Sequence, residues 1–469
     1  MSIRFPARAA LRAFMRRSLA IALLALPTAC LAAADVPIPD PGFGGNGDGI
    51  ARVPFDVVAN GSDVASAAVV ADGKLVLAGT AQIGTDSYDV AFTRLDADGQ
   101  LDTDFGSNGR VLAGLAPIYS YSGFDLARAV DGHLLYVART SEPGAVAVVG
   151  RRNADGTADA NFGGSGHRFL GADFFVDGGT DIELSRVIPR VDGKILVLGI
   201  AGVSTTGHAC QAVARLLASG ATDTGFGGGR GNVCVAPALA VGADAAYATD
   251  GIVLADGRIL LAGLARHAGG SGFDMSVTRL LPDGELDTRF GPDHDGFAYV
   301  GFDQGGTLAD AAYALTVDAS GRVVIAGFVE QQAGWNIGVA RLLPTGDLDP
   351  SFGLDGRRQF DFGFRGVAPL SARVLADGRI LIGGQFYDNA AGLALMLTPD
   401  GQRDSRFGDG GLFRQAAADA PTSAVVETQS FVLDSDYLYM VGGNRNTTSD
   451  RADFAATRVV LPLFRDGFD

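Results

Sequence analysis

The chain has 469 residues, of which 47% are hydrophobic, and it carries a formal net charge of −16. That much apolar sequence can bury a large core. A surface this negative repels nucleic acid and anionic lipid, so we expect no nucleic-acid partner.

The N-terminus has the order of a secretory signal peptide. Arg4, Arg8, Arg12, Arg16 and Arg17 precede an apolar run from Leu19 to Leu31, and small residues follow up to Ala34. This pattern predicts a signal peptide over residues 1–34 and an exported protein, whether periplasmic, cell-surface or secreted. Two alternatives are a lipoprotein signal at Cys30 and the twin-arginine route at Arg16-Arg17. The apolar run is too short to span a bilayer, and we expect no transmembrane segment elsewhere.

A Phe-Gly pair recurs along the chain at a nearly constant spacing. Successive copies lie 62, 57, 64, 64, 62 and 55 residues apart. The seven Phe residues are Phe43, Phe105, Phe162, Phe226, Phe290, Phe352 and Phe407. A period of tens of residues is typical of solenoids, propellers and arrays.

Each repeat contains four short apolar segments. In the unit from Gly296 to Gly346 they are GFAYVGFD, AAYALTVDASG, RVVIAG and NIGVARLLPTG. Runs of this length, bounded by Gly, Asp or Pro, are typical of strands. We therefore predict an all-β protein, a β-propeller of seven four-stranded blades built from repeats of about 60 residues. The propeller domain is expected over residues 35–461, followed by a short tail at 462–469.

The second turn of each unit contains a Gly and, three residues later, an Asp. A tight turn needs a residue with positive φ, which glycine adopts without strain, and an Asp at this offset can cap backbone amides. These residues are Asp102, Asp159, Asp223, Asp287, Asp349 and Asp404. The Phe of each Phe-Gly pair is the one large apolar residue of a polar loop, so we expect it to fill the core between units.

The two ends of the chain complement each other. The chain opens with a Phe-Gly turn and one strand, Gly49 to Val58, and it ends with the fourth strand of a unit, near Phe454 to Leu461. In a closed ring these two strands lie side by side, whereas an open solenoid needs a cap at each end.

The pattern ADG[KR]ILLAG followed by RLLPDGELDTRFG resembles the delta-60 repeat of bacterial exported and surface proteins. The resemblance covers residues 40–461, with a degenerate seventh copy around Ser435-Asp436. It implies a propeller-like fold and an exported location, and it supplies no catalytic residue.

Cys210 and Cys234 remain after cleavage. In an oxidising compartment an isolated pair usually forms a disulfide, and these two lie at the turn region between two predicted strands. We predict a disulfide between them, with two small buried thiols as the alternative.

Calcium is the best inorganic candidate for a ligand. Two of the turn loops resemble an oxygen-ligand loop for calcium, but turn capping explains every copy and calcium only these two. The candidate ligands are Asp96, Asp98 and Asp102, and in the next unit Asn153, Asp155 and Asp159. We expect no cofactor, with calcium at these residues as the alternative.

The sequence contains no nucleophile elbow, zinc-protease helix motif or phosphate loop. The histidines fall at unrelated points of their units: His133, His167, His208, His267 and His294. Residues peculiar to one unit are better candidates for a site, namely Trp335 and the segment Phe386 to Asn389, although blade-edge packing also explains them.

These features lead to a main hypothesis and two alternatives. The main one is an exported, non-catalytic propeller, monomeric, that binds a protein or glycan partner through loops on one face. The first alternative is a propeller enzyme, a glycan- or lactone-cleaving hydrolase or lyase, whose site the sequence does not identify. The second is an adhesion role of the array itself.

Overall fold

The computed structural model describes residues 37–461 apart from 60, 116–123, 141–145, 177–178, 180, 204–207, 237–245, 267–271, 303–308, 332–333, 364–365, 387–390, 416–424, 435–436 and 447–450. The chain divides into Met1–Ala33 and a compact unit from Ala34 onward, and only the second is described here. The predicted signal peptide, the tail and most of the Phe386 to Asn389 segment lie outside the described residues.

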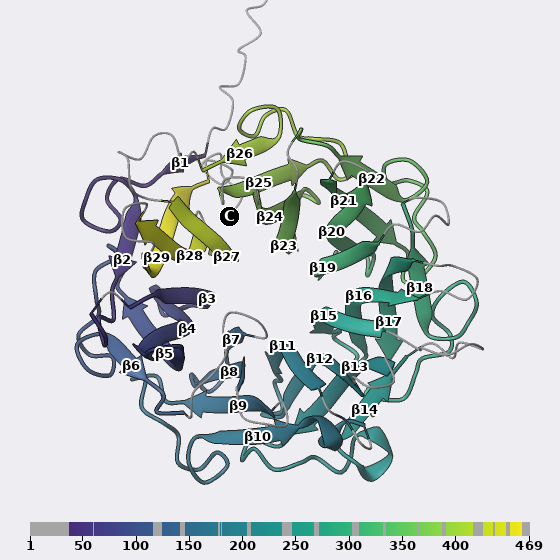
Figure 1. Ribbon diagram of the computed structural model, residues 1–469. Coiled ribbons are helices and arrows are strands. Elements are labelled where there is room, and N and C mark those ends of the chain that lie inside the picture. The colour runs from purple at the N-terminus through teal and green to yellow at the C-terminus, as the bar shows by residue number, and fades with distance from the viewer. Residues whose placement is uncertain are drawn as a thin grey trace, which may run out of the picture. The chain divides into compact units, whose positions relative to one another are not determined.

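The described residues form seven antiparallel sheets arranged as blades around a central axis (Figure 1). The all-β propeller with seven blades is therefore confirmed. The only helices among the described residues are two short 3-10 turns, η1 (Ala172–Phe174) and η2 (Gly227–Gly229). No helix in this part of the chain is long and apolar enough to cross a membrane.

The strands of blades 1 to 6 follow one another in chain order, from the central axis outward, and in blade 7 the outer strands come from the start of the chain (Figure 1). Blade 1 has β3 (Asp63–Ala71), β4 (Lys74–Gly84), β5 (Ser87–Leu95) and β6 (Arg110–Leu112); blade 2 has β7 (Asp125–Arg128), β8 (Leu134–Arg139), β9 (Val146–Arg152) and β10 (His167–Gly171); blade 3 has β11 (Asp181–Pro189), β12 (Ile195–Val203), β13 (His208–Leu216) and β14 (Asn232–Val235); blade 4 has β15 (Ala246–Val253), β16 (Ile259–Arg266), β17 (Phe273–Leu280) and β18 (Phe297–Val300). Blade 5 has β19 (Asp310–Val317), β20 (Val323–Gln331), β21 (Gly334–Leu342) and β22 (Arg357–Phe360); blade 6 has β23 (Val367–Val374), β24 (Ile380–Phe386), β25 (Gly392–Leu397) and β26 (Leu412–Arg414); blade 7 has β27 (Val425–Asp434), β28 (Tyr437–Asn446), β29 (Arg451–Val460), β2 (Ile50–Val53) and the short β1 (Ile38–Pro39).

The blades are offset by one strand from the repeats read in the sequence. The segment GFAYVGFD was assigned to the unit from Gly296 to Gly346, but it contributes β18, which pairs with β17 of blade 4 through Met275 and Val300. That assignment is wrong, because the Phe-Gly loop reverses the chain and returns it antiparallel beside the strand it has just left. The first segment of each repeat is the rim strand of the preceding blade.

The closure of the ring follows from the same offset. Strand β2, from the start of the chain, pairs with β29 from its end, with Ile50 opposite Thr457 and Val53 opposite Phe454. The predicted pairing of the two ends is confirmed, and β2 supplies the rim strand that blade 7 would otherwise lack (Figure 1). The short β1 pairs with the same strand β29, where Ile38 faces Val460.

Candidate functional site

The seven Phe rings of the Phe-Gly pairs lie between blades. All seven are fully buried. Phe290 belongs to one cluster with Met275 of blade 4 and with Ala312 and Ile325 of blade 5. At the turn that covers Phe226, a Cβ on Gly284 would lie 2.7 Å from the ring, so only glycine fits there. These are the contacts that a role in packing requires.

An arginine on the third strand of most blades ties that blade to the next. In blade 4, Arg279 Nε donates to Asp287 at 2.9 Å and Nη1 donates to the Pro344 carbonyl oxygen of blade 5 at 2.5 Å. We call this arrangement the Arg–Asp latch. It recurs as Arg94 with Asp102 and Ala154, Arg151 with Asp159 and Ala218, Arg215 with Asp223 and Pro282, Arg341 with Asp349 and Pro399, and Arg458 with Asp40 and Ala97.

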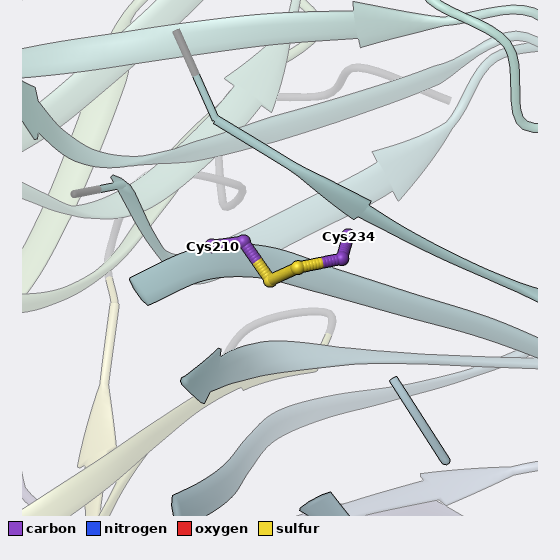
Figure 2. The surroundings of a disulfide bond; sticks show 2 residues. All are labelled: Cys210 and Cys234. Atoms are coloured by element: carbon purple, nitrogen blue, oxygen red, sulfur yellow. A yellow bond between two sulfur atoms is a disulfide. The ribbon is translucent and has the colours of Figure 1, made fainter. Parts of the chain in front are cut away.

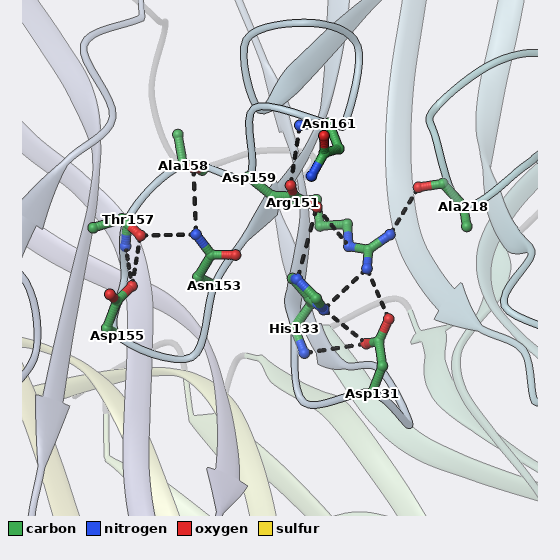
Figure 3. A network of polar contacts seen from close by, with 10 residues as sticks. All are labelled: Asp131, His133, Arg151, Asn153, Asp155, Thr157, Ala158, Asp159, Asn161 and Ala218. Atoms are coloured by element: carbon green, nitrogen blue, oxygen red, sulfur yellow. Dashed lines mark hydrogen bonds and ion pairs between the residues drawn. The ribbon is translucent and has the colours of Figure 1, made fainter.

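The carboxylate of the latch also meets a cation from the first position of the second strand or just before it. The two lysines of the chain both stand there: Lys74 Nζ lies 2.5 Å from Asp102, and Lys194 Nζ lies 2.8 Å from Asp223. The equivalent residue in blade 2 is His133, whose Nε2 lies 3.7 Å from Asp159. Figure 3 shows these two side chains together with Arg151. The sequence analysis did not predict the latch arginines or the role of these lysines. The arginines could have been found, because an Arg recurs eight residues before the Asp of the turn.

One blade lacks the latch arginine. In blade 6 the position is Met396, and Asp404 instead contacts Arg406 at 2.8 Å and Arg379 at 3.5 Å. In the other blades this arginine reaches the loop that follows the third strand of the next blade. The third strand of blade 7 is β29 (Arg451–Val460), and the segment after Leu461 lies outside the described residues. The missing arginine thus coincides with the seam of the ring.

The calcium candidates take part in these turns and latches. Asp102 and Asp159 face the cations described above. Asp96 Oδ1 accepts from the amides of Asp98 and Gln100 at 3.0 and 2.9 Å, which is turn capping. Asp155 Oδ1 accepts from the Thr157 amide at 2.9 Å, and Asn153 Nδ2 donates to the Thr157 hydroxyl at 2.8 Å (Figure 3). No group of three or more His, Cys, Asp or Glu residues that could hold a metal is found within the described residues.

The latch predicts a dependence of stability on acid pH. Burial alone would raise the pKa of Asp223, but Lys194, the Gly225 amide and Arg215 outweigh it and lower the pKa to about 2. An aspartate whose pKa is lower in the folded than in the unfolded state stabilises the fold above its ordinary pKa near 4. This stabilisation is lost as the pH falls from about 4 to about 2.

We expect the urea midpoint of the parent to fall over that window and the Asp223→Asn variant to show a smaller fall from a lower starting value. Urea unfolding at pH 7, 4, 3 and 2 measures this. Parallel curves for the two proteins would contradict the latch contribution. Asp63, Asp89 and Asp125 oppose the trend in both proteins, because burial raises their pKa values and protonation relieves that cost.

Cys210 on β13 and Cys234 on β14 are joined by a disulfide (Figure 2). The two Cα atoms are 5.4 Å apart. Cys234 lies opposite Ala212 in the register of the two strands, so the bond crosses the pair diagonally. It fastens the rim strand of blade 3 to its neighbour.

Carboxylates near the central axis also join blades. Arg186 on β11 lies 2.6 Å from Asp250 on β15 and 3.3 Å from Asp125 on β7. The remaining oxygens accept backbone amides, from Val187 to Asp125 at 2.9 Å and from Leu315 to Asp250 at 2.7 Å. Burial raises the pKa of Asp125, and Arg186 opposes this. The described bonds of this network link blades 2 to 5.

An exposed aromatic row occupies one end of blade 5. The rings of Tyr313 on β19, Phe328 on β20 and Trp335 on β21 follow one another across the sheet. The ring centres of each adjacent pair are 5.7 Å apart. Tyr313 is 39% exposed and Trp335 is 40% exposed. Tyr313 is accessible because it is the extra residue of a bulge between Ala312 and Ala314. We call these three residues the aromatic row.

Within the part of the chain that the structure describes, blade 5 alone has an aromatic residue at the bulge position. The bulge residue is Ser66, Ser185, Thr249, Leu370 or Gln429 in the other blades that have the bulge. Blade 4 has an aromatic pair at the corresponding end, Tyr247 and Phe273 at 5.7 Å, with the Arg266 guanidinium 5.1 Å from the Phe273 ring. Trp335 was singled out in the sequence, but its two ring partners were not, since they come from two other strands.

The other candidates do not gather at one site. His133 belongs to a latch, His167 lies on the rim strand of blade 2, and His294 has positive φ in a turn. His267 lies outside the described residues, as does the side chain of His208. Phe386 is fully buried in the core between blades 5 and 6.

The repeats match a domain-family model described as "Domain of unknown function (DUF5122) beta-propeller" over residues 71–105, 192–226, 254–290, 319–352 and 375–407. The chain is thus a β-propeller repeat protein. No curated protein matches it.

Solved structures that share the fold are distant. They include the polysaccharide lyase Uly1 (12% identity, 85% of this chain and 90% of that one, TM-score 0.48). A protein of unknown function from Dyadobacter fermentans has 13% identity over 88% and 99% of the two chains, with a TM-score of 0.42. The β-propeller domain of the Trilobed protease from Pyrococcus furiosus has 11% identity over 85% and 95%, also with a TM-score of 0.42.

Proposed function

We propose that this protein is an exported, non-catalytic β-propeller of the delta-60 repeat type that binds a glycan through the aromatic row of blade 5. The signal-like N-terminus and the disulfide support export, since disulfides persist in oxidising compartments. The recurring pattern ADG[KR]ILLAG followed by RLLPDGELDTRFG supports the assignment to this repeat type.

The aromatic row carries the proposal. Flat rings present large contact area at low conformational cost, and ligand sites combine such apolar surfaces with a few polar groups that orient the ligand. Glu330, which lies opposite Trp335 in the register of β20 and β21, supplies a carboxylate beside the row. Sugar rings have apolar faces and polar edges, which match this combination.

The two ends of the blades differ in how far they vary from blade to blade, and this difference supports the same proposal. At one end the Asp-Gly turns, the Phe rings and the latches repeat in nearly every blade and are occupied by packing. At the end that carries the aromatic row, the connecting segments differ in length and sequence between blades. Binding residues are commonly found on variable connections held by a rigid scaffold.

A glycan array with the chain from residue 35 onward, followed by calorimetry on the best ligand, tests the proposal. We expect Trp335→Ala to weaken binding by about tenfold or more, equivalent to ~1.4 kcal/mol, with an unchanged melting temperature. Val191→Ala is the matched control, since Val191 is 90% exposed in the turn between β11 and β12, at the other end of the blades. Its affinity should equal that of the parent.

Two results would overturn the proposal. One is a glycan affinity that Trp335→Ala leaves unchanged, and the other is an array without any ligand while a protein partner is captured through the same end. Chromatography of the bound glycan after long incubation tests the enzymatic alternative. Shortened products would move the protein to the glycan-cleaving class.

A further inference from the structure

A second surface lies at the rim of the ring, between blades 2 and 3. An open groove of about 630 Å³ runs between the loop and strand β10 of blade 2 and the turn after β13 of blade 3. Its walls include Ser165, His167, Arg168 and Phe169 on one side and Ser219 and Gly220 on the other. It lies on other blades than the aromatic row.

The groove contains no acidic residue, in a chain of net charge −16. Ser219 stands where the corresponding turns of other units have Asp98, Asp155, Asp283 and Asp400. Each of the other six junctions has at least one Asp in its Phe-Gly loop or in the facing turn. These acids are Asp48 and Asp98, Asp155, Asp283, Asp293 and Asp295, Asp355 and Asp400, and Asp409. This junction alone is free of them.

Arg168 gives the groove a positive charge that no carboxylate of the described residues neutralises. Its guanidinium donates to the Gly220 carbonyl oxygen at 2.6 Å and to the Thr222 hydroxyl at 2.8 Å, both neutral acceptors. Throughout the described residues, no carboxylate lies within ion-pair distance of it, whereas each latch arginine has its aspartate. Burial lowers the pKa of Arg168. A half-buried cation without an anion attracts an anionic ligand.

Apolar and polar groups stand beside the cation. Phe169 is 47% exposed, and its ring meets the edge of His167 at 5.1 Å. Burial lowers the pKa of His167, which favours the neutral ring, and a neutral imidazole can both donate and accept a hydrogen bond. Ser165 and Ser219 add hydroxyls. An inorganic anion gains nothing from contact with the exposed Phe169 ring, whereas the apolar face of a sugar can pack against it.

We propose that this groove binds an acidic saccharide, a sugar chain that carries carboxylate groups, with Arg168 pairing to the carboxylate and Phe169 lying against a sugar face. Bidentate pairing with a carboxylate is the geometry that the guanidinium favours. The groove has the volume of ordinary ligand sites, about 300–1,000 Å³. The inference does not depend on the glycan site proposed for blade 5.

Calorimetric titration of the chain from residue 35 onward with a galacturonate oligomer tests the proposal. We expect binding that weakens as salt rises, and no binding of a neutral glucose oligomer of the same length. Ser219→Asp should weaken the affinity tenfold or more. This change restores the acid that four sister turns already carry, so the fold tolerates it. Arg168→Met should abolish binding, and Phe169→Ala should weaken it several-fold.

The matched control is Arg358→Met, which changes the arginine at the same strand position of blade 5 and should bind like the parent. Trp335→Ala should also bind the galacturonate oligomer like the parent, which separates this site from the aromatic row. Three results would overturn the inference: no binding at millimolar oligomer, unchanged affinity in Ser219→Asp and Arg168→Met, or equal binding of sodium sulfate. A sulfated oligomer that binds more tightly than the galacturonate oligomer would also overturn the assignment to carboxylate.

Discussion

Phe290→Ala is expected to lower the free energy of unfolding by about 3–5 kcal/mol, the usual cost of removing a fully buried Phe. The ring fills the space between blades 4 and 5, where its neighbours come from both sheets. The walls cannot close over the cavity, because β17 and β19 are each fixed in their own ladders.

Two further contacts hold the ring in place. The guanidinium carbon of Arg279 lies 4.5 Å from the centre of the Phe290 ring, and Gly346 packs so closely that a Cβ there would meet the ring at 3.1 Å. Removing the ring therefore also weakens the surroundings of the latch. Phe290→Leu should fall between the parent and Phe290→Ala.

Thermal and urea unfolding of the three proteins measure the effect. Trp335→Ala is the control, since that side chain is of similar size but 40% exposed, and its unfolding midpoint should match the parent. A melting temperature of Phe290→Ala within a degree or two of the parent would refute a role for the ring in joining blades.

The sequence was sufficient to predict the fold because every repeat contains the same turn and the same apolar segments. Seven Phe-Gly turns and four apolar segments per unit specify the number of blades and their strands. The unmatched strand at each end specifies where the ring closes. These features follow from the sequence repeat, and a repeat can be recognised in a single chain.

The junctions between blades could not be predicted in the same way. The Arg279 guanidinium contacts the Pro344 carbonyl oxygen 65 residues away, and nothing in the sequence names that partner. The offset between repeat and blade depends on which side the chain returns after the Phe-Gly loop. The aromatic row joins three strands, and the rim groove joins two blades, so neither appears as a motif. The absence of Asp at position 219 becomes informative only when the turn is seen to face Arg168.

The seam should be the weakest junction of the ring, and deleting residues 35–60 is expected to lower the melting temperature by more than about 10 °C or to abolish cooperative unfolding. The deletion removes β2, which covers the outer edge of β29, and it removes Phe43, which is fully buried against blade 7 and blade 1. The loss of Phe43 alone should cost about 3–5 kcal/mol. About 1 kcal/mol shifts the melting temperature of a domain of about 150–250 residues by roughly 2–4 °C and that of a larger domain by less, so the lost strand and latch must add to the effect of Phe43.

The same deletion removes a latch. Arg458 lies 2.7 Å from Asp40 and also reaches the Ala97 carbonyl oxygen of blade 1. Without Asp40 a nearly buried guanidinium loses its anion, which is more costly than the loss of an exposed pair. The bared edge of β29 can then pair with another chain, so we also expect concentration-dependent aggregation.

Two point variants separate these contributions. Asp40→Asn keeps the strand and breaks the latch, and it should lower the melting temperature by a few degrees. Ile38→Ala changes a side chain that is 54% exposed on β1 and should leave the melting temperature unchanged. Calorimetry of the four proteins gives the comparison. A truncated chain that melts like the chain from residue 35 onward would show that β2 does not close the ring, because a closed ring cannot lose the pairing of β1 and β2 with β29 without losing stability.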